Sequence, residues 1–205
     1  MYASLDYPAF WEEMYNTNRV NWDTKNPHPV FAALLDNSDF LTPGKMLVTG
    51  CGKGFDAVMA AGKGFKVTAI DFSATAIGFA KQLAEENKAD IHFLNEDIFL
   101  LDQKYNESFD YIYEYTTYCA INPERRNEFA VKISSLLKKG GRLISILFPV
   151  DEREGGPPFS VDVKEFYKNF SEYLQLEFSS RQINSIKPRK GREILQVYYK
   201  KKGNT

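Results

Sequence analysis

The chain has 205 residues, of which 43% are hydrophobic and 26% are charged, a composition typical of a globular protein with a substantial core. Its formal net charge of −1 at pH 7 argues against nucleic acid as the main partner, and no apolar run is long enough to cross a membrane. Cys51 and Cys119 have no C-x-x-C spacing, so we expect reduced thiols in a cytoplasmic protein.

Short apolar segments alternate with helical patterns along the chain. Strands are predicted, in order, at 45–50, 65–71, 91–97, 109–115, 142–149, 174–178 and 193–200. Helices are predicted at 56–62, after Ser73, within 122–141 and at 163–170. This alternation is typical of a single-domain, Rossmann-like α/β fold with a mostly parallel seven-stranded sheet and helices on both faces. Ligands of such folds lie beyond the carboxyl ends of the strands.

Two of the predicted helices carry N-terminal signals. Ser73 can cap a helix that places Ile77, Ala80 and Ala84 on one apolar face. Asn122 can cap another helix, which would have a proline at its first position and end before a pair of glycines.

A glycine-rich stretch, LVTGCGKGFD, joins the first predicted strand to the helix predicted at 56–62. Gly50, Gly52 and Gly54 stand at every second position, which indicates a tight turn or a closely approaching ligand. A P-loop is excluded because each Gly-Lys pair lacks the following Ser or Thr.

A dinucleotide site agrees with the glycines only in part. Gly50-x-Gly52 follows a strand, and Asp71 stands about twenty residues later, where a carboxylate can hold ribose hydroxyls. The third glycine of that fingerprint would fall at Phe55, whose ring blocks the approach of a pyrophosphate. The turn therefore favours a nucleoside with an amino-acid tail, S-adenosylmethionine, while a nicotinamide-dependent oxidoreductase stays open as the alternative.

Several longer stretches carry a more specific resemblance. In chain order they are FWEEMYNTNRVNWD, GCGKGFDA, DYIYEYTTYCAINPERR, GGRLISILFP and REGGPPFSV, and they run from about residue 10 to the end. In these stretches the chain resembles the thiopurine and thiol/halide methyltransferases, which are class I S-adenosylmethionine-dependent enzymes. The resemblance implies the Rossmann-like methyltransferase fold.

The resemblance also implies a set of cofactor-binding residues. They are Trp11, Tyr15, Trp22, Gly50, Gly52, Asp71, Asp97, Ile98 and Tyr115. The two tryptophans match residues that contact the cofactor, where an indole N–H can donate to the methionine carboxylate. Their alternative role is that of buried anchors. Tyr15 stands where the thiol/halide branch often has tryptophan, a departure that bears on acceptor specificity.

Each of the other positions has an implied role. Main-chain amides at Gly50 and Gly52 would face the cofactor carboxylate. Asp71 would accept from both ribose hydroxyls, and Asp97 with Ile98 would hold the adenine. The alternative roles are a tight turn for the two glycines, a helix cap for Asp71 and a simple loop for the segment with Asp97.

The acceptor side is assigned in the same way. Tyr115 would contact the region of the donor methyl, or be an ordinary core aromatic. Arg126 matches an arginine near the acceptor of the thiopurine enzymes, although on a helix it is also expected as a solvated charge. GGPPF (155–159) would shape the pocket roof with Phe159 facing the acceptor, and no acid or base is assigned. The basic residues near the C-terminus are expected to form a solvated edge: Arg189, Lys190, Arg192 and 200–202.

No metal site is expected, because His28 and His92 have no ligand-like neighbours in the sequence, and both cysteines are expected to serve packing. The predicted function is methyl transfer from S-adenosylmethionine to a small thiol or halide, with a thiopurine-type heterocyclic thiol as the second choice. A non-catalytic S-adenosylmethionine-binding module is a further alternative. We expect residues 1–30 to form a lid over a methyltransferase domain at 31–205, in a monomer or weak homo-oligomer without nucleic-acid or membrane partners.

Overall fold

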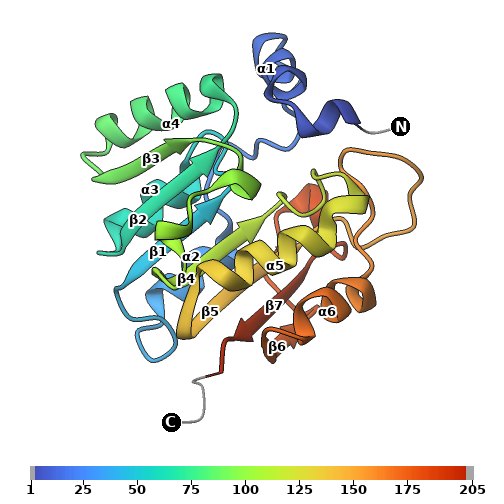
Figure 1. The fold of residues 1–205 in the computed structure, drawn as a ribbon. Coiled ribbons are helices and arrows are strands. Elements are labelled where there is room, and N and C mark those ends of the chain that lie inside the picture. The colour runs from blue at the N-terminus through green and yellow to red at the C-terminus, as the bar shows by residue number, and fades with distance from the viewer. Residues whose placement is uncertain (1–2, 202–205) are drawn as a thin grey trace. The chain divides into compact units, whose positions relative to one another are not determined.

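The computed structural model describes residues 3–201, in which helices and strands alternate along the chain (Figure 1). The chain forms two compact units, which we call the N-terminal unit (up to Leu100) and the C-terminal unit (from Leu101). Every helix within residues 3–201 is too short or too polar to cross a lipid bilayer.

The N-terminal unit contains three parallel strands in the order β3-β2-β1. They are β1 (Lys45–Thr49), β2 (Lys66–Asp71) and β3 (Ile91–Asn95). The helices are α1 (Pro8–Asn16), α2 (Pro29–Asp36), α3 (Phe55–Gly62) and α4 (Ala74–Glu86), with 3₁₀ turns η1 (Ala3–Asp6) and η2 (Ile98–Leu100). Because the strands are parallel, the loops that follow them share one edge of this unit.

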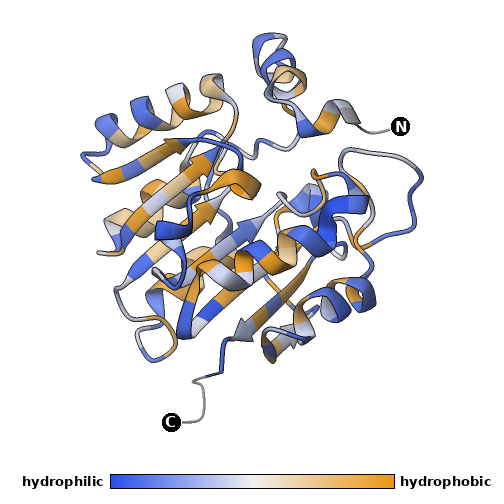
Figure 2. Ribbon diagram, viewed as in Figure 1, coloured by the Kyte–Doolittle hydropathy of each residue, from blue (hydrophilic) through white to orange (hydrophobic). Residues whose placement is uncertain are grey.

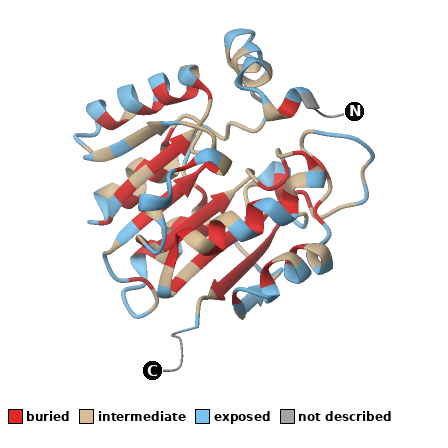
Figure 3. Ribbon diagram, viewed as in Figure 1, coloured by how far each residue is buried: buried red, intermediate tan, exposed pale blue. Residues whose placement is uncertain are grey.

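Burial and capping explain why β1 and α4 form where they do. Met46, Leu47 and Val48 are buried in succession, as expected of a parallel strand covered on both faces (Figure 3). At the start of α4, Ser73 Oγ accepts a hydrogen bond from the Ala76 N–H at 3.1 Å. The predicted cap is thus confirmed, and α4 buries the apolar face that its spacing predicts.

The C-terminal unit contains four strands in the order β4-β5-β7-β6. They are β4 (Phe109–Tyr115), β5 (Leu137–Leu147), β6 (Gln175–Ser180) and β7 (Ile194–Tyr199). The helices are α5 (Arg126–Leu136) and α6 (Val163–Ser171), with 3₁₀ turns η3 (Gln103–Tyr105), η4 (Pro123–Arg125) and η5 (Lys187–Arg189). Hydrophobic residues concentrate in the strands and alternate with hydrophilic ones along the helices (Figure 2).

The direction of β7 decides which loops share the ligand-binding edge of this unit. β4 and β5 are parallel, whereas β7 runs antiparallel to β5, with Leu147 paired to Ile194. Glu193, just before β7, therefore lies at the edge where β4 ends with Tyr115. Ligands of open α/β sheets bind at this carboxyl edge.

Two boundaries differ from the sequence prediction. The helix predicted after Asn122 starts as the 3₁₀ turn η4, in which the Glu124 N–H donates to Asn122 Oδ1 at 3.2 Å, and α5 follows. Gly140 and Gly141, predicted to follow the helix, fall inside β5 because their backbone bonds to Lys200 at 2.8 and 2.9 Å. The prediction of a mostly parallel seven-stranded α/β fold is confirmed.

Candidate functional site

The three glycines after β1 have left-handed backbones, with φ of 50° at Gly50, 53° at Gly52 and 83° at Gly54. They do not share one role. A Cβ added at Gly54 would lie 2.9 Å from the Ala80 Cβ, so this glycine permits the close packing of α3 on α4. The close approach at Gly54 is therefore made by the protein itself and not by a ligand.

Gly52 is joined to the acid at the end of β2. The Gly52 N–H donates to Asp71 Oδ2 at 2.9 Å, and the Ser73 N–H donates to Asp71 Oδ1 at 3.0 Å. This differs from the expectation that the Gly52 amide faces a ligand carboxylate, because the tight turn aims that amide at β2. Burial raises the pKa of Asp71 to about 6, a rise that the Ser73 and Gly52 amides oppose.

Aromatic residues of the N-terminal segment lie at the same turn. A Cβ added at Gly52 would lie 3.2 Å from the Tyr15 hydroxyl oxygen. The Tyr15 ring packs edge-on against Trp22 at 5.8 Å, and Trp22 packs edge-on against Trp11 at 5.5 Å. The structure therefore brings Tyr15, Gly52 and Asp71 together. Trp22 packs against Tyr15, and Trp11 packs against Trp22.

The indole nitrogens have partners within the protein. The Trp11 Nε1–H donates to the Leu5 carbonyl at 3.1 Å, and the Trp22 Nε1–H donates to the Tyr15 hydroxyl at 3.5 Å. Burial raises the pKa of Tyr15 well above its usual value, with the charge of Asp71 adding to the rise, so the hydroxyl stays protonated. In this structure the Trp11 N–H therefore has a partner within the N-terminal segment itself.

Asp97 and Ile98 follow β3 at the same edge. Asp97 Oδ1 accepts from the Phe99 N–H at 3.0 Å and starts the turn η2, in which Ile98 is buried. Asn95 at the end of β3 donates from Nδ2 to the Asp71 carbonyl at 3.2 Å, a link between neighbouring strand ends that sequence reasoning missed. The structure thus places Asp71 at the end of β2 and Asp97 just after the adjacent strand β3.

In the C-terminal unit, Tyr115 ends β4 and is held by two buried charges. Its hydroxyl donates to Glu193 Oε1 at 2.7 Å and accepts a hydrogen bond from Arg189 Nη1. Arg189 is only 4% exposed and Glu193 only 2%. The expectation that Arg189 belongs to a solvated edge is therefore wrong, although its neighbour Lys190 is exposed.

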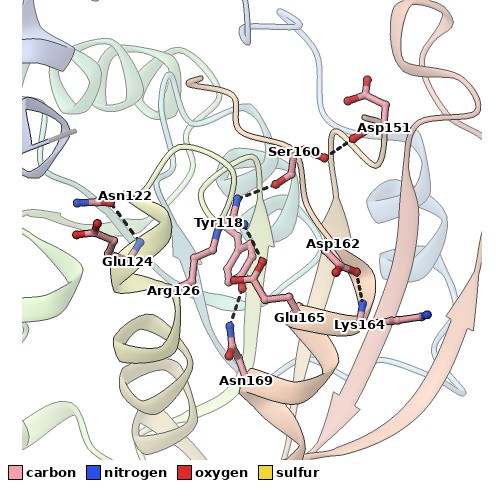
Figure 4. Close-up of polar contacts among 10 residues, drawn as sticks. All are labelled: Tyr118, Asn122, Glu124, Arg126, Asp151, Ser160, Asp162, Lys164, Glu165 and Asn169. Atoms are coloured by element: carbon pink, nitrogen blue, oxygen red, sulfur yellow. Dashed lines mark hydrogen bonds and ion pairs between the residues drawn. The ribbon is translucent and has the colours of Figure 1, made fainter. Parts of the chain in front are cut away.

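Arg126 is also buried, with 4% exposure, so its expected place as a solvated helix charge is wrong. Nη1 donates to Glu165 Oε2 and Nη2 to the Ser160 carbonyl, both at 3.0 Å (Figure 4). Its guanidinium lies 4.7 Å from the centre of the Tyr118 ring. Its Nε is buried and has no hydrogen-bond partner among the described residues.

Phe159 and the GGPPF segment are packed into the C-terminal unit. The Phe159 N–H donates to the Cys119 carbonyl at 2.8 Å, and a Cβ added at Gly156 would lie 2.6 Å from the Phe159 ring. Ser160 Oγ donates to the Asp151 carbonyl, which closes the loop (Figure 4). The ring of Phe159 therefore fixes this loop from within and is largely buried.

Comparison with known proteins identifies the family. The family model of thiopurine S-methyltransferase matches residues 7–201. A probable thiol methyltransferase 2 of Arabidopsis thaliana is 38% identical over 191 residues, which are 90% of this chain and 82% of the relative. Thiocyanate methyltransferase 1 of the same plant is 36% identical over 158 residues, 76% of this chain and 68% of the relative. The chain belongs to the thiopurine S-methyltransferase family.

A solved structure supports the fold of this thiopurine methyltransferase-family protein. The 1,6-didemethyltoxoflavin-N1-methyltransferase of Burkholderia thailandensis, determined with bound S-adenosylhomocysteine, superposes with a TM-score of 0.74 and 19% identity. The match covers 98% of this chain and 89% of that one. The Rossmann-like methyltransferase fold is confirmed, and the protein is an S-adenosylmethionine-dependent methyltransferase.

The residues at the edge of the N-terminal unit fit this cofactor. Asp71 offers two carboxylate oxygens, each with a lone pair beyond the one that its backbone donor uses. Gly52 leaves room where a side chain would meet Tyr15, whereas Phe55 fills the place of a pyrophosphate-binding glycine. The set therefore suits an adenosyl group with an amino-acid tail better than it suits a dinucleotide.

Other polar groups of this family member are used for structure. Glu114 is buried and accepts from the Thr117 and Tyr118 amides at 3.0 and 2.8 Å, which fixes the loop after β4. Burial raises the pKa of Cys119 to about 12, so this thiol is not a ready nucleophile. Among residues 3–201, no group of three or more His, Cys, Asp and Glu side chains is arranged to hold a metal ion.

Proposed function

We propose that this protein transfers the methyl group of S-adenosylmethionine to a small soft nucleophile, with thiols and halides preferred. The main support for this proposal is that Tyr15, Gly52 and Asp71 lie together at one strand edge of a thiopurine methyltransferase-family chain. The two plant relatives are named as thiol and thiocyanate methyltransferases, which supports soft, sulfur-containing acceptors.

In this proposal the N-terminal unit holds the cofactor. Asp71 accepts from the ribose hydroxyls, and Asp97 with Ile98 contacts the adenine at the neighbouring strand end. Gly50 and Gly52 leave room for the amino-acid tail. The rings of Trp11, Tyr15 and Trp22 supply an aromatic surface, and rings beside a sulfonium contribute about 0.5–2 kcal/mol of cation–π attraction.

The C-terminal unit supplies the acceptor side. S-adenosylmethionine, when bound, provides a methyl carbon already activated by its sulfonium charge, so no acid or base is assigned. The chain's task is alignment, which can supply on the order of 7–11 kcal/mol of barrier reduction. Tyr115 and Phe159 are proposed to contact the acceptor through their rings.

Arg126 is proposed to favour an anionic acceptor. Free thiols have a pKa near 8.5 and are only a few per cent ionised at pH 7. A guanidinium close to the sulfur raises that ionised fraction. Halides and thiocyanate are anions at every physiological pH and need no such help. A thiopurine-type heterocyclic thiol is the second candidate acceptor, because its sulfur is also soft and ionisable.

We further propose that residues 1–30 act as a lid over a methyltransferase domain at 31–205. In support, α1 has no buried residue (Figure 3). It meets α4 through polar contacts between Glu12 and Thr75. We also infer a cytoplasmic protein, a monomer or weak homo-oligomer, on the basis of its two unpaired cysteines and modest net charge.

The decisive experiment combines binding with turnover. Calorimetry should show that the protein binds S-adenosylhomocysteine and does not bind NADH. The protein should then methylate members of a panel that contains iodide, thiocyanate, a small thiol and a thiopurine. Binding of NADH alone would favour the oxidoreductase alternative. Binding of S-adenosylhomocysteine without transfer to any panel member would favour a non-catalytic binding module.

A further inference from the structure

Two buried, oppositely charged residues meet at one tyrosine hydroxyl in the C-terminal unit. Arg189 precedes β7 in the turn η5, and Glu193 directly precedes β7. Tyr115 donates its hydroxyl proton to Glu193 Oε1 at 2.7 Å and accepts from Arg189 Nη1. Burying an arginine and a glutamate costs free energy, and such pairs often add little net stability. Their presence at a strand end therefore calls for a role beyond packing.

The surroundings of the pair fix its geometry further. Arg189 lies over two rings, 5.0 Å from the centre of Tyr115 and 4.4 Å from that of Phe148. Ser185 Oγ donates to the second carboxylate oxygen of Glu193. The guanidinium and the carboxylate are thus each held by a second contact, so the tyrosine hydroxyl meets two groups of limited freedom.

The tyrosine itself is only partly covered. Tyr115 is intermediate in exposure, unlike the fully buried Arg189 and Glu193, and it stands at the carboxyl edge of β4. Burial raises the pKa of its hydroxyl well above the usual value, although Arg189 opposes that rise, so the proton stays available for Glu193. A ring whose hydroxyl is bound on both sides cannot swing, and its position at the edge is therefore fixed.

We propose that Arg189 and Glu193 are positioning residues for methyl transfer, which hold the Tyr115 ring in place against the reacting groups. This inference rests on the proposed function and adds two residues to it. Alignment of reacting atoms is the main demand of such a reaction, and small displacements are costly in rate. The pair acts through Tyr115 and touches neither the cofactor nor the acceptor in this proposal.

The test compares variants of the whole protein with iodide as the acceptor, because iodide does not titrate. Tyr115→Phe keeps the ring and removes only the hydroxyl. It should lower kcat by about ten- to a hundredfold, with the dissociation constant of S-adenosylhomocysteine unchanged within about threefold. Arg189→Met should do the same, and Arg189→Lys should recover part of the rate.

A matched control exists at the other end of the same strands. Tyr199 on β7 also has an arginine over its ring, with Arg142 5.9 Å from the ring centre, and pairs with Arg142 across from β5. Tyr199→Phe should leave kcat unchanged. If Arg189→Met fails to fold, Tyr115→Phe and Glu193→Gln still decide the question.

The double variant Tyr115→Phe/Glu193→Gln separates positioning from stability. If the pair positions Tyr115, the kcat of the double variant should match that of Tyr115→Phe alone, because both changes break the same hydrogen bond between Tyr115 and Glu193. Lower melting temperatures with unchanged kcat in the single variants would overturn the proposal and leave a purely structural pair. Failure of the wild-type protein to methylate any acceptor would instead overturn the proposed function.

Discussion

The Tyr15 hydroxyl stands over Gly52, at a distance where one added carbon on the glycine would lie 3.2 Å from its oxygen. This relationship ties the N-terminal segment to the turn between β1 and α3. Since Gly52 also donates to Asp71, the same residue links the segment to the end of β2. The glycine turn is therefore a junction of three chain segments as well as a candidate ligand contact.

Gly52→Ala should damage both the fold and cofactor binding. A left-handed backbone costs an L-residue about 1–2 kcal/mol, and the new methyl group would lie 3.2 Å from the Tyr15 hydroxyl oxygen, which must shift slightly. We expect S-adenosylhomocysteine to bind at least about tenfold more weakly, which equals 1.4 kcal/mol. Calorimetry and urea unfolding provide the two measurements.

Gly78→Ala is the matched control for that change. Gly78 lies inside α4 with open space around it, so alanine there should raise the free energy of unfolding by about 0.5–1 kcal/mol. Binding of S-adenosylhomocysteine should not change. Equal affinities of the Gly52→Ala and Gly78→Ala proteins would remove Gly52 from the site.

Cofactor binding should depend on pH through Asp71. The pKa of Asp71 is about 6 in the folded protein, so below that pH the carboxyl group is protonated and must lose its proton to accept from both ribose hydroxyls. The affinity for S-adenosylhomocysteine should fall by up to about tenfold per pH unit below pH 6. Asp71→Asn should bind weakly at every pH, without this dependence, and a wild-type profile with no fall below pH 6 would contradict the assignment.

The same carboxyl group should also affect the free energy of unfolding, which should fall as the pH rises, whereas cofactor affinity rises with pH. Burial raises its pKa from 3.8 to about 6, so the folded protein holds the proton more tightly than the unfolded chain does. The resulting stabilisation is fully present below about pH 4 and is lost as the pH rises through 6. Relative to the wild type, Asp71→Asn should therefore gain in free energy of unfolding between about pH 4 and about pH 7.

Arg126 should prove necessary for the loop that ends at Ser160. Arg126→Met leaves the Ser160 carbonyl and Glu165 without their donor, and we expect the free energy of unfolding to fall by about 2–4 kcal/mol. The KM for the acceptor should rise, while the affinity for S-adenosylhomocysteine stays constant.

The neighbouring arginine tests the specificity of that effect. Arg125 pairs with Glu128 at 2.8 Å, and both side chains are partly exposed. Arg125→Met should cost less than about 1 kcal/mol and leave the KM for the acceptor unchanged. Equal effects of the two substitutions would show that Arg126 has no special role in the loop.

Sequence reasoning succeeded where the signal is local. Apolar runs and the Ser73 cap predicted the strands and α4, and the position of Asp71 at the end of β2 followed from strand order. It failed where partners are distant in sequence. Tyr115 meets Arg189 and Glu193 across 74 and 78 residues, and no local pattern separates a buried arginine from the solvated lysines beside it.

Gly54 shows a second kind of failure. Its place in the glycine run suggested a ligand, yet the atom that approaches it belongs to Ala80 on α4. A glycine required by helix packing and one required by a ligand have the same sequence signature, because both reflect the missing Cβ. Only the packing of α3 on α4 distinguishes them.

The lid hypothesis predicts that α1 detaches when its polar contacts with α4 are removed. Thr75 donates from its hydroxyl to Glu12 Oε2 at 2.5 Å and from its N–H to Oε1 at 3.3 Å, whereas the Glu13 side chain pairs with the exposed Arg19. Glu12→Ala should therefore speed proteolysis within residues 1–30, and Glu13→Ala should not. S-adenosylhomocysteine should slow this cleavage in the wild-type protein, since a lid is ordered by the ligand it covers. Cleavage at the same rate with and without S-adenosylhomocysteine would mean that the segment is fixed by the fold and does not act as a lid.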